Sequence, residues 1–85
     1  MKTIFVMVKC ELSKAYAVAD AAVGSLEQVS EVYSTSGQYD LLLKVYLPDA
    51  ADIGHFVTER LQTLPGVRDT FTIIAFKAFS PDASV

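Results

Sequence analysis

A run of β-branched and aromatic residues near the start of the chain predicts a first strand from Thr3 to Cys10. Alternate residues of a strand point to opposite faces of its sheet. Both sets are apolar here: Ile4, Val6 and Val8 on one face, Phe5 and Met7 on the other. A strand that is apolar on both faces is typical of the centre of a sheet that is covered on both sides.

Apolar residues at helical spacing predict two helices. The first begins at Ser13, a good N-cap residue type, and its apolar stripe is mostly alanine. The second has Asp49 as its cap and Asp52 in its first turn, and Pro65-Gly66 ends it. The two stripes are Ala15, Val18, Ala19, Ala22, Val23 and Leu26, and then Ile53, Phe56, Val57, Leu61 and Leu64.

A hairpin is predicted between the helices. Val29 to Thr35 forms its weaker strand, Ser36-Gly37-Gln38 its turn and Tyr39 to Leu47 its stronger strand. A last strand is predicted from Val67 to Phe79, and Ser80 to Val85 is predicted to be a polar tail. In the stronger hairpin strand, one face has Leu41, Leu43, Val45 and Leu47, and the other has Asp40, Leu42, Lys44 and Tyr46.

The resulting order of elements predicts one α+β domain over residues 1–79, followed by the tail at 80–85. Right-handed crossovers place both helices on one face of a four-stranded antiparallel sheet, the βαββαβ, ferredoxin-like arrangement. The other face keeps large apolar groups, which is unusual for a monomer. We therefore expect a homodimer in which two sheets pair about a twofold axis, of the dimeric α+β barrel type.

The composition agrees with association and excludes several functions. At 85 residues and 52% apolar, the chain buries only roughly 60% of its unfolded surface by itself. Ten acidic residues outnumber seven scattered basic ones, so no basic patch for direct nucleic-acid binding is expected. One cysteine, Cys10, allows no disulfide framework and no metal-ligand spacing, and no cofactor is indicated. The apolar run at the N-terminus is too short for a membrane span and lacks a cleavage pattern, so a cytoplasmic protein is expected.

The turn and the strand after it carry the most suggestive chemistry. Gly37 allows unusual backbone conformations and close approach of a ligand, and Ser36 offers a hydroxyl. Turn amides suit a carboxylate, and Asp40 suits an ammonium group, so a zwitterionic amino acid would find both partners. The alternative is a plain hairpin turn that Asp40 caps, and the residues alone favour it because turn chemistry is common.

Four segments in order resemble a known family. Ser36-Gly37-Gln38-Tyr39-Asp40-Leu41 resembles a Gly-x-Tyr-Asp pattern, and the others are Phe56-Val57, Leu64-Pro65-Gly66-Val67 and Thr70-Phe71-Thr72. Over about residues 2–78 the chain thus resembles the effector-binding (RAM) domain of Lrp/AsnC-type transcriptional regulators. Because the sequence starts at the first strand, it resembles the stand-alone form that lacks a helix-turn-helix.

The resemblance implies a non-enzymatic module that binds an amino acid or similar small effector and modulates full-length Lrp/AsnC-type regulators. It also implies sheet-to-sheet dimers assembled into an octamer or similar ring, with effectors near subunit interfaces. Carried over by position, the ligand contacts are Ser36, Gly37, Tyr39 and Asp40 from the hairpin, and Thr70 and Thr72 from the last strand. The threonines have an alternative role in strand packing, since Thr is favoured in strands.

Two other functions stay open at this point. One is a small dimeric α+β barrel enzyme of the monooxygenase or isomerase type, and the other is a structural partner that binds no ligand. His55 lies off the apolar stripe of its helix, near Asp52 and Glu59, without a nucleophile or metal ligand, so we do not expect catalysis. We expect an inert Cys10 that is buried or half-buried, and the aromatic residues Phe71, Phe76 and Phe79 in a core or an interface.

Overall fold

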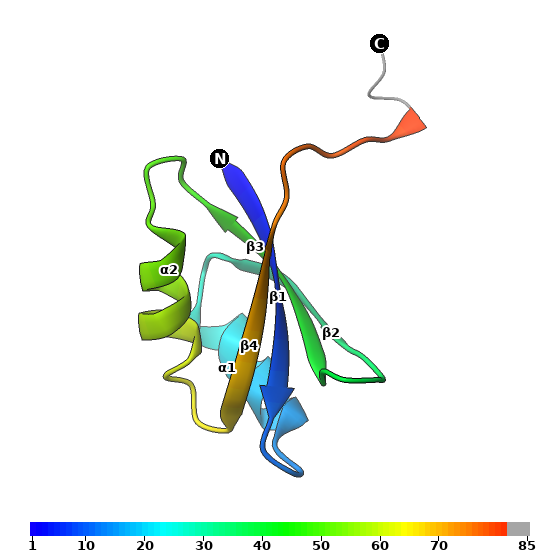
Figure 1. Ribbon diagram of the computed structural model, residues 1–85. Helices are drawn as coiled ribbons and strands as arrows, with labels where there is room; N and C mark the ends of the chain where they lie inside the picture. The colour runs from blue at the N-terminus through cyan, green and yellow to red at the C-terminus, as the bar shows by residue number, and fades with distance from the viewer. Residues whose placement is uncertain (82–85) are drawn as a thin grey trace.

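The computed structural model describes residues 1–81, and Figure 1 shows a single sheet with helices beside it. No helix among these residues has the length and apolar character needed to cross a membrane. The elements are β1 (Lys2–Cys10), α1 (Ala15–Ser25), β2 (Val29–Ser34), β3 (Leu41–Leu47), α2 (Ile53–Phe56), a π-helical turn η1 (Val57–Leu61) that continues α2, and β4 (Val67–Ile74).

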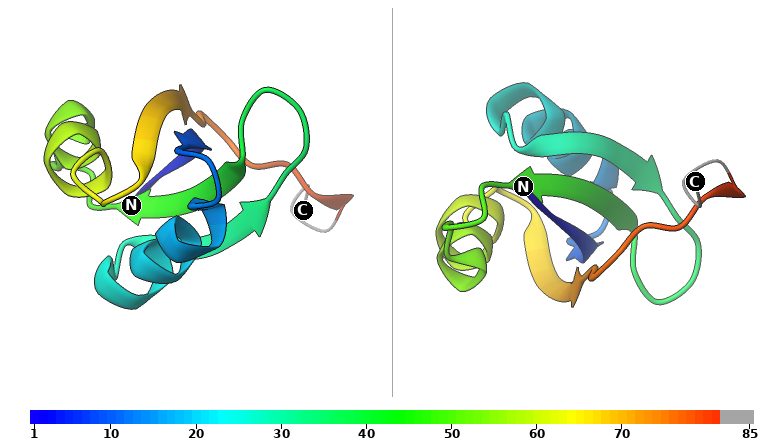
Figure 2. Two further views of the ribbon diagram at one scale, coloured as in Figure 1. Left: turned by 90° about the horizontal axis from the view of Figure 1, so that it is seen from below. Right: turned by 90° about the horizontal axis from the view of Figure 1, so that it is seen from above.

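The four strands form an antiparallel sheet in the order β2-β3-β1-β4. Each helix crosses over one intervening strand, and both helices lie on the same face of the sheet (Figure 2). The predicted α+β, ferredoxin-like fold is therefore confirmed. The central position of β1 explains why its sequence is apolar on both faces.

The pairing register divides the sheet into two chemically different faces. Ile4 lies opposite Val45 on one side and Ile74 on the other, and all three point toward the helices. Phe5 lies opposite Lys44 and Ile73 and points away from them. We call this second side the open face, and its large apolar residues are Phe5, Met7, Tyr33, Leu42, Tyr46, Phe71 and Ile73.

The hydrophobic core lies between the helices and the sheet. It contains no charged or other polar side chain among the described residues, apart from the Cys10 thiol. Cys10 is buried, which is one of the two predicted environments. The core residues are Ile4, Val6, Val8 and Cys10 of β1, Val18, Ala22 and Leu26 in and after α1, Val29 of β2, Leu41, Leu43, Val45 and Leu47 of β3, and Phe56, Val57 and Leu61 of the second helical segment.

Both predicted N-caps are wrong. Ser13 has φ 67° and sits in a turn closed by the Lys14 N–H donating to the Glu11 carbonyl at 3.0 Å, so α1 starts one residue later without a side-chain cap. At α2, Asp52 is the cap, and its carboxylate accepts from the His55 N–H at 3.0 Å. Asp49 instead pairs with the N-terminal ammonium at 2.7 Å.

The helical stripes were predicted correctly except at one position. Val23 is 58% exposed, because α1 packs on the sheet mainly through Val18 and Ala22, and Val23 lies at the edge of that contact. The second helix widens into a π-helical turn, where the Gln62 N–H donates to the Val57 carbonyl at 2.8 Å. Val57 and Leu61 at the two ends of this turn are both buried.

The last strand is shorter than predicted. After Ile74, one further N–H, that of Ala75, donates to the Thr3 carbonyl at 3.1 Å, and the strand ends there rather than at Phe79. β1 itself begins at Lys2, so no neighbouring backbone remains for later residues to pair with. We call residues 75–81 the arm; of the predicted tail, 80–81 belong to it and 82–85 lie outside the described residues.

Two valines on α1 test how much the fold depends on the core. Val18→Ala should lower the free energy of unfolding by about 2 kcal/mol, because it removes two buried methyl groups and leaves a cavity. Val23→Ala makes the same chemical change in the same helix at an exposed position, and should change the free energy by at most about 0.5 kcal/mol. Urea unfolding at one fixed protein concentration measures both, and equal effects of the two would contradict the described packing.

Candidate functional site

Four of the predicted ligand contacts lie in or next to the loop between β2 and β3. Ser36, Gly37 and Gln38 are exposed at its tip. Gly37 has φ 105°, in the left-handed region, and a Cβ at this position would meet no atom within 4 Å. Glycine is therefore required here by the backbone conformation rather than by packing, and the space beside it is open to a ligand.

The base of this loop is fixed by hydrogen bonds, while its tip is not. The Thr35 N–H donates to the Asp40 carbonyl at 2.9 Å, and the Thr35 hydroxyl donates to the Tyr39 carbonyl at 3.0 Å. Within the described part of the chain, the backbone N–H groups of residues 36–38 have no protein acceptor. The loop thus combines unpartnered amides at an exposed tip with a hydrogen-bonded base, an arrangement suited to a carboxylate.

Asp40 connects the loop to the end of β1. Its Oδ2 accepts from the Cys10 N–H at 2.7 Å, and its own N–H donates to the Val8 carbonyl at 2.9 Å. This is the capping role that the residues alone favoured. Oδ1 makes no hydrogen bond within residues 1–81, so the same carboxylate still has an oxygen available for an ammonium group.

Cys10 is not a reactive group in this site. Its thiol is buried in the core, and this burial raises its pKa, with a smaller contribution in the same direction from the negative charge of Asp40. The thiol therefore stays protonated at neutral pH and is a poor nucleophile. The inert role expected for Cys10 agrees with this environment.

An aromatic contact joins the loop to the open face. The rings of Tyr39 and Phe71 stack with centroids 6.2 Å apart at an angle of 27°. Tyr39 is half-buried by this contact, whereas Phe71 remains 53% exposed. The sequence indicated that Phe71 belongs to a core or interface, but it gave no sign of this pairing, since the two residues are far apart along the chain.

The two threonines of β4 point to the other face of the sheet. Thr70 lies opposite Val8 and Thr72 opposite Val6, on the side of the helices. The Thr70 hydroxyl accepts from Gln62 Nε2 at 2.8 Å, a partner that the sequence analysis missed. Within one copy, the threonines and the Tyr39–Phe71 pair share one end of the sheet but lie on opposite faces of it.

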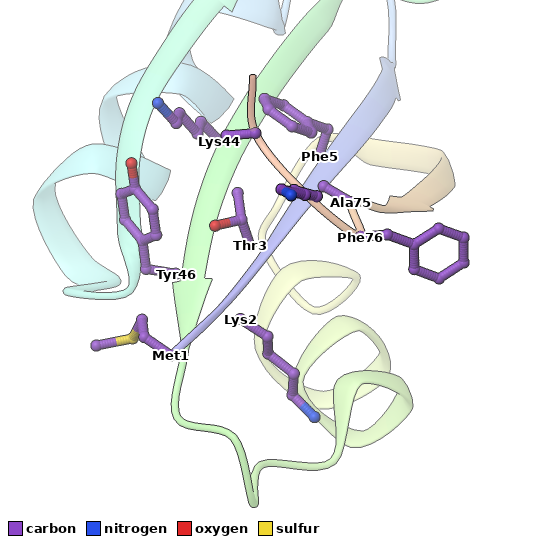
Figure 3. Close-up of a pocket in the computed structure, with 10 residues that line it drawn as sticks. Met1, Lys2, Thr3, Phe5, Lys44, Tyr46, Ala75 and Phe76 are labelled. Atoms are coloured by element: carbon purple, nitrogen blue, oxygen red, sulfur yellow. The ribbon is translucent and has the colours of Figure 1, made fainter. Parts of the chain in front are cut away.

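A separate cleft of about 550 Å³ lies at the other end of the open face (Figure 3). Thr3, Phe5, Lys44 and Tyr46 form its floor, with the ammonium of Lys44 5.4 Å from the centre of the Tyr46 ring. The arm supplies another wall. Its lining includes three lysines, of which Lys2 points away from the others and donates from its ammonium to the Ala51 carbonyl at 2.6 Å. The sequence pattern gives no sign of this cleft, because one of its walls is the arm, which was predicted to be part of a strand.

The described residues offer no metal centre. No three His, Cys, Asp or Glu side chains among residues 1–81 gather closely enough to hold an ion. His55 lies on the exposed side of α2, and its Nε2 is 3.3 Å from a Glu59 carboxylate oxygen. This places His55 next to Asp52 and Glu59, as the helical spacing indicated, and outside both the loop and the cleft.

Comparison with known proteins points to a family of regulators. The family described as the Lrp/AsnC ligand binding domain matches residues 3–85. The leucine-responsive regulatory protein of Salmonella typhimurium is 40% identical over 58 residues, which cover 68% of this chain and 35% of that protein. Across the curated relatives it matches, which are regulators rather than enzymes, the chain spans about a third to a half of their length.

Solved structures agree with the fold. A protein from Thermus thermophilus is 38% identical with a TM-score of 0.82, and the match covers 94% of this chain and 99% of that one. A transcriptional regulator from Neisseria meningitidis, solved as an L-Met complex, matches at 24% identity with a TM-score of 0.80, covering 93% of this chain and 52% of that one. At that identity the likeness extends to the fold alone.

Substitution of Asp40 tests its structural role. Asp40→Ala should lower the free energy of unfolding by about 1–3 kcal/mol, because the Cys10 N–H loses its acceptor. Asp40→Asn keeps an oxygen at the same place and should recover most of this loss. Urea unfolding of the two variants beside the unchanged protein measures both effects, and an alanine variant as stable as the asparagine variant would rule out the cap.

Proposed function

Since the chain belongs to the Lrp/AsnC ligand-binding domain family, we propose that this regulatory effector-binding module binds a free amino acid at the loop of residues 35–40. The ligand carboxylate would accept from the amides at the loop tip, and the ligand ammonium would donate to Asp40. The single observation that supports this most is that one loop contains both an available Asp40 oxygen and unpartnered amides at residues 36–38.

The names of two regulators are consistent with an amino-acid effector. The Salmonella protein is called leucine-responsive, and the Neisseria regulator was solved with L-Met. The proposal therefore takes L-amino acids as the class to test first. Which one binds depends on what surrounds the ligand side chain, and within one copy the half-buried Tyr39 and its partner Phe71 offer it an apolar surface.

The proposed site needs a second copy to be complete. Thr70 and Thr72 point to the helical side of the sheet, whereas Tyr39 stacks on the open face. The six predicted residues therefore cannot all contact the same small molecule within a single copy. We propose that Ser36, Gly37, Tyr39 and Asp40 of one copy hold the ligand, and that the threonines contribute from a neighbouring copy.

Self-association is proposed on independent grounds. The open face carries Phe71, Ile73 and Tyr33 with 53%, 42% and 50% of their surfaces exposed. Contiguous apolar surface of this kind is rare on soluble monomers and marks interaction sites. Pairing of two open faces about a twofold axis would bury these residues and leave the loops accessible, and a further ring such as an octamer would bring loops of different dimers together.

The physiological partner proposed for the module is a full-length regulator of the same family. The chain covers only part of each such relative, and the covered part has the same fold. Mixed assembly through open faces would then let an amino acid bound here alter the assembly of the regulator. Pull-down with a complete Lrp/AsnC-type regulator distinguishes this from a module that pairs only with itself.

Amino-acid binding can be tested by thermal shift with the twenty L-amino acids, followed by calorimetry on those that stabilise the protein. A ligand at about 100 times its dissociation constant should raise the free energy of unfolding by about 2.7 kcal/mol. Asp40→Asn should weaken binding at least tenfold, because it removes the charge that pairs with the ammonium while keeping the loop capped.

Two controls make this result specific to the proposed contact. Asp20→Asn removes a carboxylate from the exposed surface of α1 and should leave binding unchanged. The N-acetyl form of the ligand has no ammonium, so the unchanged protein and Asp40→Asn should bind it equally weakly. No stabilisation by any amino acid, or full affinity in Asp40→Asn, would refute the proposed site.

The proposed pairing of open faces predicts the effect of a buried charge. Leu42→Glu and Ile73→Glu should each convert the associated protein into a 9.2 kDa monomer, since a carboxylate would be buried without a partner. Val23→Glu makes a similar change on the exposed part of α1 and should leave the assembly intact. Sedimentation equilibrium at micromolar concentration measures the mass, and a monomeric unchanged protein would contradict the pairing.

A further inference from the structure

The arm carries the two most exposed aromatic rings of the described chain. Phe76 is 98% exposed and Phe79 is 83% exposed. Phe79 contacts the Lys77 ammonium, 5.1 Å from the ring centre, and this neighbour belongs to the arm itself. A phenylalanine can bury about 150–250 Å² in a suitable contact, so two of them in one short segment represent a large unused apolar surface.

The direction of the arm leads it away from its own body. The Ala75 N–H donates to the Thr3 carbonyl of the sheet, and the chain then departs on the side of the sheet opposite the helices, as both views of Figure 2 show. In Figure 3 the Phe76 ring points away from Lys44 and Tyr46 rather than over them. The arm therefore lines one side of the cleft with residues 75–78, while the Phe76 ring points away from the open face of the same copy.

We infer that the arm of each copy packs against a second copy of this chain, with Phe76 and Phe79 on that copy. This inference rests on the proposed pairing of open faces. A partner seated on the open face lies on the same side of the sheet as the arm, and so lies within its reach. Twofold symmetry makes the contact reciprocal, because a surface that receives one arm also supplies the other.

The protein that contacts the arm is a second copy rather than an unrelated protein, because the arm and the open face form one continuous surface. The Thr3 carbonyl accepts from the Ala75 N–H at the start of the arm, and Thr3 and Phe5 are also part of the cleft that the arm borders. Whatever covers Phe5 must also meet the arm. Seven extended residues span about 23 Å, which is enough to reach across much of a facing four-stranded sheet.

A double substitution measures the contribution of the rings to association. Phe76→Ser combined with Phe79→Ser should raise the dissociation constant of the dimer at least tenfold, a change equivalent to about 1.4 kcal/mol. Ala78→Ser introduces the same hydroxyl between the two positions and should change the constant less than twofold. Sedimentation across a concentration series gives all three values, and circular dichroism verifies that the variants fold.

The outcomes separate this inference from the proposal on which it depends. An associated protein whose dissociation constant is unchanged by the double substitution overturns the role of the arm and leaves the pairing of open faces standing. A monomeric unchanged protein overturns both. Weakened association in the double variant, with Ala78→Ser unaffected, supports the arm.

A mixed sample locates the arm directly. One copy carries Cys10→Ala and Ser80→Cys with a nitroxide on the new cysteine, and the other carries Cys10→Ala and is labelled with ¹⁵N and ²H. The nitroxide of the unlabelled copy should broaden the amide signals of open-face residues such as Tyr33, Leu42 and Lys44 in the labelled copy. Signals of Asp20 and Ala21 on α1 should stay sharp.

The same mixed sample with the nitroxide at Asp20→Cys is the matched control, because that position lies on the exposed surface of α1. It should leave the open-face signals sharp. The inference would be overturned if, in an associated sample, the Ser80→Cys label broadened no amide signals or broadened only signals of the helices.

Discussion

The two-sided apolar character of β1 is the constraint on which the rest of the molecule depends. Hydrogen bonds to β3 and β4 fix both edges of this strand, so its side chains can point only toward the helices or away from them. Ile4, Val6 and Val8 fill the core under the helices. Phe5 and Met7 then have no place except the opposite side, which the helices of residues 1–81 do not cover. The proposed pairing of open faces thus originates in the sequence of a single strand.

The loop chemistry depends on the same strand. Asp40 reaches the end of β1 through the Cys10 N–H, which couples the stability of the domain to the residue proposed to meet the ligand ammonium. One carboxylate oxygen holds the loop in place, and the other stays available. A carboxylate that is already positioned before the ligand binds needs little reorganisation on binding, which favours affinity.

Periodicity alone was sufficient to predict the order of elements, the faces of β1 and β3, and most of the core. It was not sufficient for the caps, because Asp49 and Asp52 are equally good cap residue types and only the path of the turn decides between them. The end of β4 could not be predicted either, since the apolar residues up to Phe79 suit a strand but have no neighbouring backbone to pair with. For the candidate site, the sequence predicted the loop residues, and their binding of a ligand stays a prediction. That Tyr39 and the threonines lie on opposite faces depends on register, which is a property of pairs of strands.

The positions of the chain's two ends have a consequence for how a signal could travel. Lys2 pairs with Leu47 at one pole of β1, and Val8 pairs with Leu41 at the other, so the start of the chain and the base of the arm lie at the pole opposite the loop (Figure 1). A domain joined ahead of Met1 would be separated from the loop by the stretch of β1 from Lys2 to Val8, about 20 Å. Occupancy of the loop would then be relayed through the rigid strands or through changes in subunit arrangement, not through direct contact with the attached domain.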